Sequence, residues 1–114
     1  YEPWGYTPLE SIAFGIPTIT TDLAGFGLWA KKHVTGNNIS EGVAVVNRDD
    51  FNYFEVADAI TSSILALAGK DKKEAEEIRK RSFCLAAKAE WSKFIVYYEE
   101  AFRIALEHAN KRNN

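Results

Sequence analysis

Hydrophobic and polar positions follow two different periods along the chain, one typical of buried strands and one typical of amphipathic helices. Two short apolar runs rich in β-branched residues, 17–21 and 42–46, predict buried parallel strands. A stripe at helical spacing within 53–67 predicts an amphipathic helix, and it consists of Val56, Ile60, Ile64 and Leu67. Alternating helices and strands in the first part of the chain are typical of an α/β fold with a parallel sheet.

The first helix is predicted from residues that favour a helix start. Thr7 suits the N-cap position, and Pro8 suits the first helical position. Glu10 completes the pattern of a capping box, in which it and Thr7 satisfy each other's backbone N–H groups. Gly15 and Pro17 are expected to end this helix.

The middle of the chain carries two further helix starts. A loop at 22–27 is expected to lead into a helix at about 28–34. We interpret the two glycines of the loop as providing backbone freedom at a turn, with close approach of the loop to a substrate as the alternative. Asn52 and Glu55 match a second capping box before the helix at 53–67.

The C-terminal part is predicted to form two long helices. Asp71 with Glu74 starts a charged helix that runs to about Glu90, and a break is expected near Trp91. A last helix from 93 to about 109 is expected to bury one side. That side consists of Phe94, Tyr97 or Tyr98, Ala101, Ala105 and Leu106.

The small predicted sheet bears on domain organisation. Two strands are fewer than a stable sheet contains, so we expect further strands upstream of Tyr1 in a longer protein. Residues 1–114 would then be a single partial domain, and the lack of any methionine supports this expectation. Unpaired strand edges favour self-association, so a homo-oligomer is expected.

Composition and charge exclude several classes of function. A hydrophobic content of 46% without any run of membrane-span length is typical of a globular protein outside membranes. The net charge of -2 argues against a nucleic-acid partner. His33 and His108 lie in separate predicted helices, with no neighbouring Cys or His at metal-ligand spacing, so no metal site is predicted. The single Cys84 cannot form an internal disulfide, which fits the cytoplasm, and we interpret it as a packed small hydrophobe.

The strongest candidate for chemistry is the beginning of the chain. Glu2 and Glu10 flank the predicted helix start, where free backbone N–H groups and the helix dipole favour an anion. Carboxylates also accept hydrogen bonds from hydroxyl groups. This segment therefore has the groups to hold a phosphate together with several hydroxyls.

The motif extends beyond two spaced carboxylates. Residues 2–10 read E-P-W-G-Y-T-P-L-E and resemble the E-x7-E motif of retaining glycosyltransferases, in particular the glycogen synthase family of animals and fungi. Residues 15–17 and 20–27 resemble the same family, and so do Trp91, Tyr97-Tyr98 and Ala105-Leu106. The resemblance is dense over about the first 35 residues and patchy from there to Leu106.

This resemblance implies a fold and an activity. The fold would be α/β, the C-terminal part of a Rossmann-like nucleotide-sugar-binding domain of a GT-B glycosyltransferase. Residues 1–69 would end the donor-binding domain, and residues 70–114 would form long C-terminal α-helices. The activity would be retaining transfer of glucose from UDP-glucose to the non-reducing end of an α-1,4-glucan, without a cofactor. The family compensates the diphosphate with an Arg and a Lys from upstream of this segment, so the chain alone is expected to be inactive.

The resemblance also implies roles for individual residues. Glu2 would contact the donor glucose near its 3-hydroxyl and act as the catalytic carboxylate. The donor-binding residues would be Trp4, Gly5, Tyr6, Thr7 and Glu10. Among these, the backbone of the first three would hold sugar hydroxyls, Thr7 would meet the diphosphate, and Glu10 would bind the ribose hydroxyls.

A second implied site concerns regulation by glucose 6-phosphate. The family binds this effector through an arginine-rich helix upstream of the position matched by Trp91. Here Arg79 and Arg81 remain as candidate effector-binding residues, among lysines and glutamates that suit a solvated helix face. We therefore expect weak or absent activation.

Three alternatives remain open from the sequence. Another retaining enzyme of the same architecture, making sucrose or a cell-wall glycan, would carry a similar motif. A non-catalytic module could instead use the helices from Asp71 onward for assembly. Trp91 is interpreted as an anchor of the helix junction, with a platform for a sugar ring as the alternative.

Overall fold

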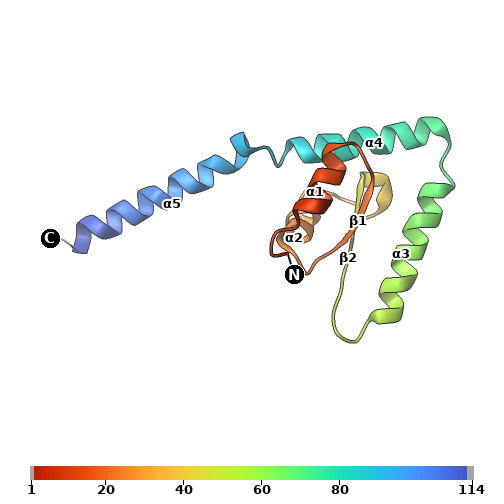
Figure 1. Ribbon diagram of the computed structural model, residues 1–114, viewed down its shortest axis with the longest axis horizontal. Helices are drawn as coiled ribbons and strands as arrows, with labels where there is room; N and C mark the ends of the chain where they lie inside the picture. Colours follow the sequence, from red (N-terminus) through yellow and green to blue (C-terminus); the bar gives the residue numbers. More distant parts are fainter. Residues whose placement is uncertain (1, 113–114) are drawn as a thin grey trace.

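The computed structural model describes residues 2–112 and shows a mixed α/β, mostly helical chain with a small parallel sheet (Figure 1). The elements in order are α1 Tyr6–Ala13, β1 Thr18–Thr21, α2 Gly25–Lys31, a 3-10 helix η1 Ile39–Glu41, β2 Val43–Val46, α3 Tyr53–Ala68, α4 Lys72–Ala87 and α5 Trp91–Arg112. This order confirms the predicted alternation of helices and strands and the two long C-terminal helices. Only η1 has no counterpart in the sequence prediction.

The two strands pair in parallel, as the apolar runs predict. Thr18 lies opposite Val43, and the register continues to Thr21 opposite Val46. β2 is the better covered strand, because the side chains of its first three residues are buried while all of β1 is half-buried.

A compact core joins the sheet to three helices. It contains Ile12 from α1, Phe26 and Ala30 from α2, Val43 and Val45 from β2, and Leu85 from α4. The approach of α4 to the start of β2 depends on Gly42, where a Cβ atom would lie 2.5 Å from the Ser82 backbone nitrogen. The buried Ser82 hydroxyl donates a hydrogen bond to the Gly42 carbonyl oxygen at 3.1 Å, so this close contact is also polar.

Two of the three predicted capping boxes are absent, although α3 begins at Tyr53 with Asn52 as its N-cap, as predicted. The N-cap of α1 is Gly5 rather than Thr7, and Thr7 and Glu10 form no capping box. The second box, at Asn52 and Glu55, is also absent. The Asn52 side chain instead accepts from the Asp49 N–H at 2.9 Å, so it stabilises the loop before α3.

The capping box of α4 is confirmed. The Glu74 N–H donates to Asp71 Oδ1 at 2.8 Å, and the Asp71 N–H donates to Glu74 Oε2 at 3.1 Å. α4 ends at Ala87, so the break before α5 lies at 88–90, slightly earlier than predicted.

The loop predicted at 22–27 is helical from Gly25 onward, while residues 22–24 are not helical. α2 begins at Gly25, about three residues earlier than predicted, and ends at Lys31. A Cβ atom at Gly27 would lie 1.9 Å from the Thr21 carbonyl oxygen. Gly27 therefore permits close packing of α2 on β1, which differs from the predicted freedom at a turn.

The predicted burial of α5 is wrong. This helix extends away from the sheet and from the other helices (Figure 1), and none of its residues is buried. Tyr97 is 70% exposed and Leu106 is 66% exposed, while Phe94 near the start of the helix is half-buried. The apolar side of α5 has the expected period, but no surface among the described residues covers it.

Candidate functional site

The loop before α1 is held by the first amides of α2. The Gly25 N–H donates to the Pro3 carbonyl oxygen at 2.9 Å, and the Phe26 N–H donates to the Trp4 carbonyl oxygen at 2.5 Å. The first amides of a helix have no partner within the helix, so they are free to bind another segment. Residues 2–5, which we call the motif loop, are thereby fixed against α2 through the backbone.

Gly5 turns the motif loop into α1. Its φ of 99° and ψ of 63° lie in the left-handed region, which glycine adopts without a steric penalty. A Cβ atom at Gly5 would also lie 3.1 Å from the Phe26 Cβ atom. Both conditions favour glycine at this position.

Glu2 lies in the loop before α1, as predicted, and its carboxylate binds the first amide of the helix. Its Oε1 atom accepts the Tyr6 N–H at 2.5 Å. A carboxylate at a helix N-terminus is stabilised by the free amides and by the helix dipole. The Glu2 side chain is nevertheless exposed, so its second oxygen can accept a bond from a ligand.

Thr7 and Glu10 follow on the exposed surface of α1. Residues three or four positions apart share one side of a helix, so Tyr6 and Thr7 lie on the side that carries Glu10. Glu10 lies in the second turn rather than in the predicted first turn. The structure thus brings both carboxylates and Thr7 to the beginning of one helix, with all three side chains exposed.

Asp22 connects three elements at the carboxyl edge of the sheet, a connection that the sequence analysis missed. Its Oδ1 atom accepts the Arg48 N–H at 2.9 Å, and its Oδ2 atom accepts Lys31 Nζ at 2.7 Å. Burial alone would raise the pKa of Asp22, but the bonds from Lys31 and from the Arg48 N–H together leave this pKa below its usual value. An acidic residue directly after a parallel strand was the available signal, because ligands of open α/β sheets bind at this edge.

Trp4 and Tyr6 line a pocket between the start of α1 and the start of α5. The pocket has a volume of about 410 Å³. We call it the aromatic pocket, and it is lined by Trp4, Tyr6, Leu9, Ala89, Trp91, Phe94 and Tyr98. Trp91 is 60% exposed, and its ring centre lies 5.1 Å from that of Tyr98 in the same helix. Trp91 therefore lies at the junction of α4 and α5, as predicted, with most of its side chain exposed.

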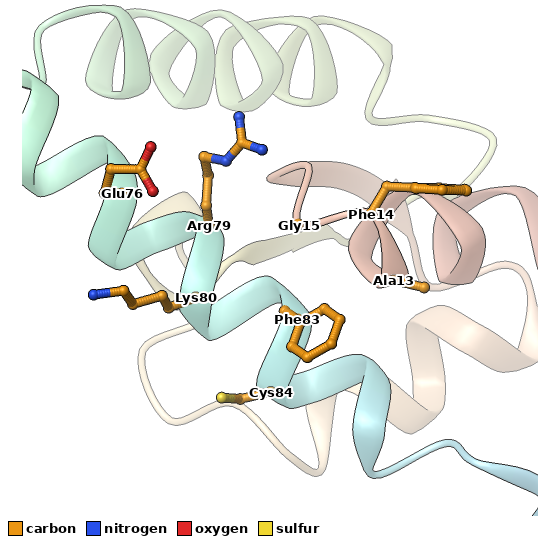
Figure 2. Close-up of a pocket in the computed structure, with 8 residues that line it drawn as sticks. All are labelled: Ala13, Phe14, Gly15, Glu76, Arg79, Lys80, Phe83 and Cys84. Carbon is orange, nitrogen blue, oxygen red and sulfur yellow. The ribbon is translucent and has the colours of Figure 1, made fainter.

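Arg79 and Arg81 do not converge on one site. Arg79 lines a groove of about 560 Å³ between α4 and the end of α1 (Figure 2). Lys80 lines the same groove, and its side chain extends away from Gly15. Arg81 donates to the Ser40 carbonyl oxygen at 2.8 Å and so contacts η1. Two positions on a helix differ by about 200° around its axis, which explains the separation.

Cys84 also lines this groove, and its side chain is exposed rather than packed in the core (Figure 2). Within residues 2–112, no cluster of His, Cys, Asp or Glu side chains could hold a metal ion. No helix in this described part of the chain is long and apolar enough to cross a membrane.

These features define an α/β unit in which a carboxylate and a clamped loop surround a helix N-terminus. The model of the glycogen synthase family matches residues 1–113. The chain belongs to the glycogen synthase family.

Curated relatives agree with this assignment. A glycogen [starch] synthase of Caenorhabditis elegans is 32% identical over 107 residues, which cover 94% of this chain and 16% of the relative. Glycogen [starch] synthase of Neurospora crassa and the human liver enzyme are each 30% identical over 109 residues, which cover 96% of this chain and 15% of each relative. The chain thus spans about one sixth of the length of these relatives.

Proposed function

We propose that this chain supplies the loop that binds the donor sugar in a retaining glucosyltransferase. The longer protein that contains the chain is called the complete enzyme below. It would transfer glucose from UDP-glucose to the non-reducing end of an α-1,4-glucan. The observation that carries the proposal is the match to the glycogen synthase family over residues 1–113. The bond from the Tyr6 N–H to Glu2, at the start of α1, supports it. In this proposal α1 to α3 belong to a Rossmann-like donor-binding domain of GT-B architecture.

The geometry of α1 supports a role for Glu2 beside the donor glucose. The transition state of glycosyl transfer resembles an oxocarbenium ion, so a nearby carboxylate stabilises its positive charge. The Tyr6 N–H holds one Glu2 oxygen, which leaves the other oxygen for the sugar. We assign Glu2 as the catalytic carboxylate on this basis.

The remaining donors at the start of α1 suit the diphosphate. The Tyr6 N–H is bonded to Glu2, and Pro8 has no N–H group. The exposed first-turn donors that remain among the described residues are the Thr7 N–H group and the Thr7 hydroxyl. Glu10, one turn further along the same side, would accept the ribose hydroxyls.

The proposal requires cations and an acceptor site outside this chain. Lys31 in the described region is already paired with Asp22, so it is not free for a diphosphate. We propose that the rest of the complete enzyme supplies these cations, that the enzyme acts in the cytoplasm, and that it is a homo-oligomer. The single cysteine and the uncovered side of α5 support the last two points.

The experiment that tests this function compares Glu2→Gln with Glu10→Ala in the complete enzyme. Glu2→Gln keeps an oxygen for the Tyr6 N–H but loses the charge, so turnover should fall by at least about a hundredfold while UDP affinity changes little. Glu10→Ala should mainly weaken UDP-glucose binding, because ribose contacts persist from the ground state to the transition state. The measurements are the rate of glucose transfer to glycogen and calorimetric binding of UDP.

The result also depends on the observed capping. Because Glu10 forms no capping box, Glu10→Ala should leave the melting temperature nearly unchanged. Wild-type enzyme that transfers no glucose from UDP-glucose would refute the proposal, as would full turnover by Glu2→Gln.

A further inference from the structure

The aromatic pocket has a packed base and an open rim. Trp4 and Phe94 are half-buried, and their rings meet edge to face with centres 5.8 Å apart. At the rim, Tyr6 is 63%, Trp91 60% and Tyr98 51% exposed. The rings of Tyr6, Trp91 and Tyr98 are therefore accessible to a ligand, and those of Trp4 and Phe94 are packed against each other beneath it.

The chemistry of the lining selects one kind of occupant. Among residues 2–112, no charged residue lines the aromatic pocket, so a phosphate or a charged peptide would find no ionic partner in this part of the chain. Four of its five aromatic rings carry an N–H or O–H group, namely those of Trp4, Tyr6, Trp91 and Tyr98. Rings of this type suit a ligand with apolar faces and a polar rim.

A sugar ring has this composition, because its C–H groups form flat faces and its hydroxyls form the edge. An apolar helix of another protein would match aliphatic walls instead, and only Leu9 and Ala89 are aliphatic here. The volume of about 410 Å³ is in the range of small-ligand sites.

The aromatic pocket also shares residues with the motif loop. The backbone of Trp4 and Tyr6 is used within the fold, since the Trp4 carbonyl oxygen accepts from Phe26 and the Tyr6 N–H donates to Glu2. The same two residues also line the aromatic pocket. A molecule in this pocket would therefore lie next to the loop assigned to the donor glucose.

We propose that the aromatic pocket binds a glucose unit of the linear α-1,4-glucan acceptor. This inference rests on the proposed function and adds the residues that would contact the acceptor. Trp91 and Tyr98 stack on the sugar faces, and the open rim lets the glucan chain continue into solvent.

The test uses maltoheptaose as the acceptor for the complete enzyme. Trp91→Ala and Tyr98→Ala should each raise the KM for maltoheptaose by roughly tenfold, the factor that corresponds to the loss of one aromatic contact. The KM for UDP-glucose should stay unchanged in both variants. The matched control is Phe102→Ala, because Phe102 is 63% exposed on the same helix but does not line the aromatic pocket.

A second variant keeps the test valid if truncation disturbs the fold. Ala89→Phe adds a ring to the aromatic pocket without removing packing, and it should raise the KM for maltoheptaose in the same way. Unchanged acceptor KM in Trp91→Ala and Ala89→Phe would overturn the inference. A lower melting temperature with unchanged acceptor KM would also overturn it and would show that another part of the enzyme covers the pocket.

The two proposals fail in distinguishable ways. Wild-type enzyme that neither binds UDP nor transfers glucose would refute the proposed function itself. Wild-type enzyme that does both, with acceptor KM insensitive to Trp91 and Ala89, would refute only the acceptor site.

Discussion

At the scale of single residues, the motif loop is held in place by a few specific atoms. Gly5 combines a left-handed backbone with contact to Phe26, and Glu2 provides the acceptor for the first amide of α1. Asp22 plays a comparable part at the sheet edge, where one carboxylate joins β1, α2 and the loop after β2. These residues position the candidate site through geometry rather than through size or hydrophobicity.

Asp22→Asn should destabilise the complete enzyme at neutral pH and have little effect in strong acid. The pKa of Asp22 is lowered overall, because the bonds from Lys31 and the Arg48 N–H outweigh its burial. A carboxyl group of this kind stabilises the folded state above its unfolded pKa of about 3.9, and this contribution is lost as the pH falls through the lower folded pKa.

The measurement for Asp22→Asn is the melting temperature at about pH 7, above the unfolded pKa, and at an acid pH below the lowered folded pKa. Asp58→Asn is the control, because Asp58 is exposed on α3. An equal loss of stability by Asp22→Asn at both pH values would contradict this explanation.

At the scale of secondary structure elements, the helix caps differ in what they contribute. The reciprocal bonds of Asp71 and Glu74 satisfy two amides at the start of α4. α3 has no such box, although Asn52 and Glu55 have the matching sequence pattern. The two helices therefore offer a direct comparison of a formed and an unformed cap.

Asp71→Ala should destabilise α4 by about 1 kcal/mol, the usual cost of losing an N-cap side chain. Glu55→Ala should have almost no effect, because Glu55 makes no capping bond in the structure. Denaturant unfolding and hydrogen exchange of the first turn of each helix measure these effects. Equal destabilisation by the two substitutions would show that the α3 box forms in solution.

Hydrophobic periodicity was sufficient to predict the strands and the long helices, because these features depend on local sequence, and the alternation of helices and strands indicated the parallel pairing. The start of α1 was not predictable in this way, since Gly5 is selected by contact with Phe26 from a later helix. The start of α2 has a similar cause, because its first amides bind the carbonyl oxygens of Pro3 and Trp4. The carboxylates of the candidate site were evident from the motif, whereas the bond between Asp22 and Arg48 depends on how the two strands end side by side.

At the scale of the whole molecule, the chain is more extended than a compact domain of its length. Its radius of gyration is 17.9 Å, whereas about 13 Å is expected for this number of residues. Its accessible surface is 8146 Å², compared with about 6,300 Å² for a compact protein of this mass. α5 extends away from the other elements (Figure 1), and none of its residues is buried.

The chain expressed alone should therefore self-associate and should show no transferase activity. Exposed apolar surface of this extent drives association, and the cations for the diphosphate are expected from elsewhere. Sedimentation velocity at several concentrations tests the first expectation, and transfer from UDP-glucose to glycogen tests the second. Replacing Tyr97 and Phe102 with lysine should reduce the association, whereas a monodisperse wild-type monomer would contradict it.

The clustering of aromatic rings around the motif loop has an optical consequence. The chain contains three tryptophans, and Trp4 and Trp29 lie with ring centres 6.4 Å apart while Trp91 lines the neighbouring pocket. α3 carries tyrosine and phenylalanine but no tryptophan. Tryptophan emission, excited at the red edge of the absorption band, therefore reports on the motif loop, α2 and the start of α5. α3 contributes no signal to it.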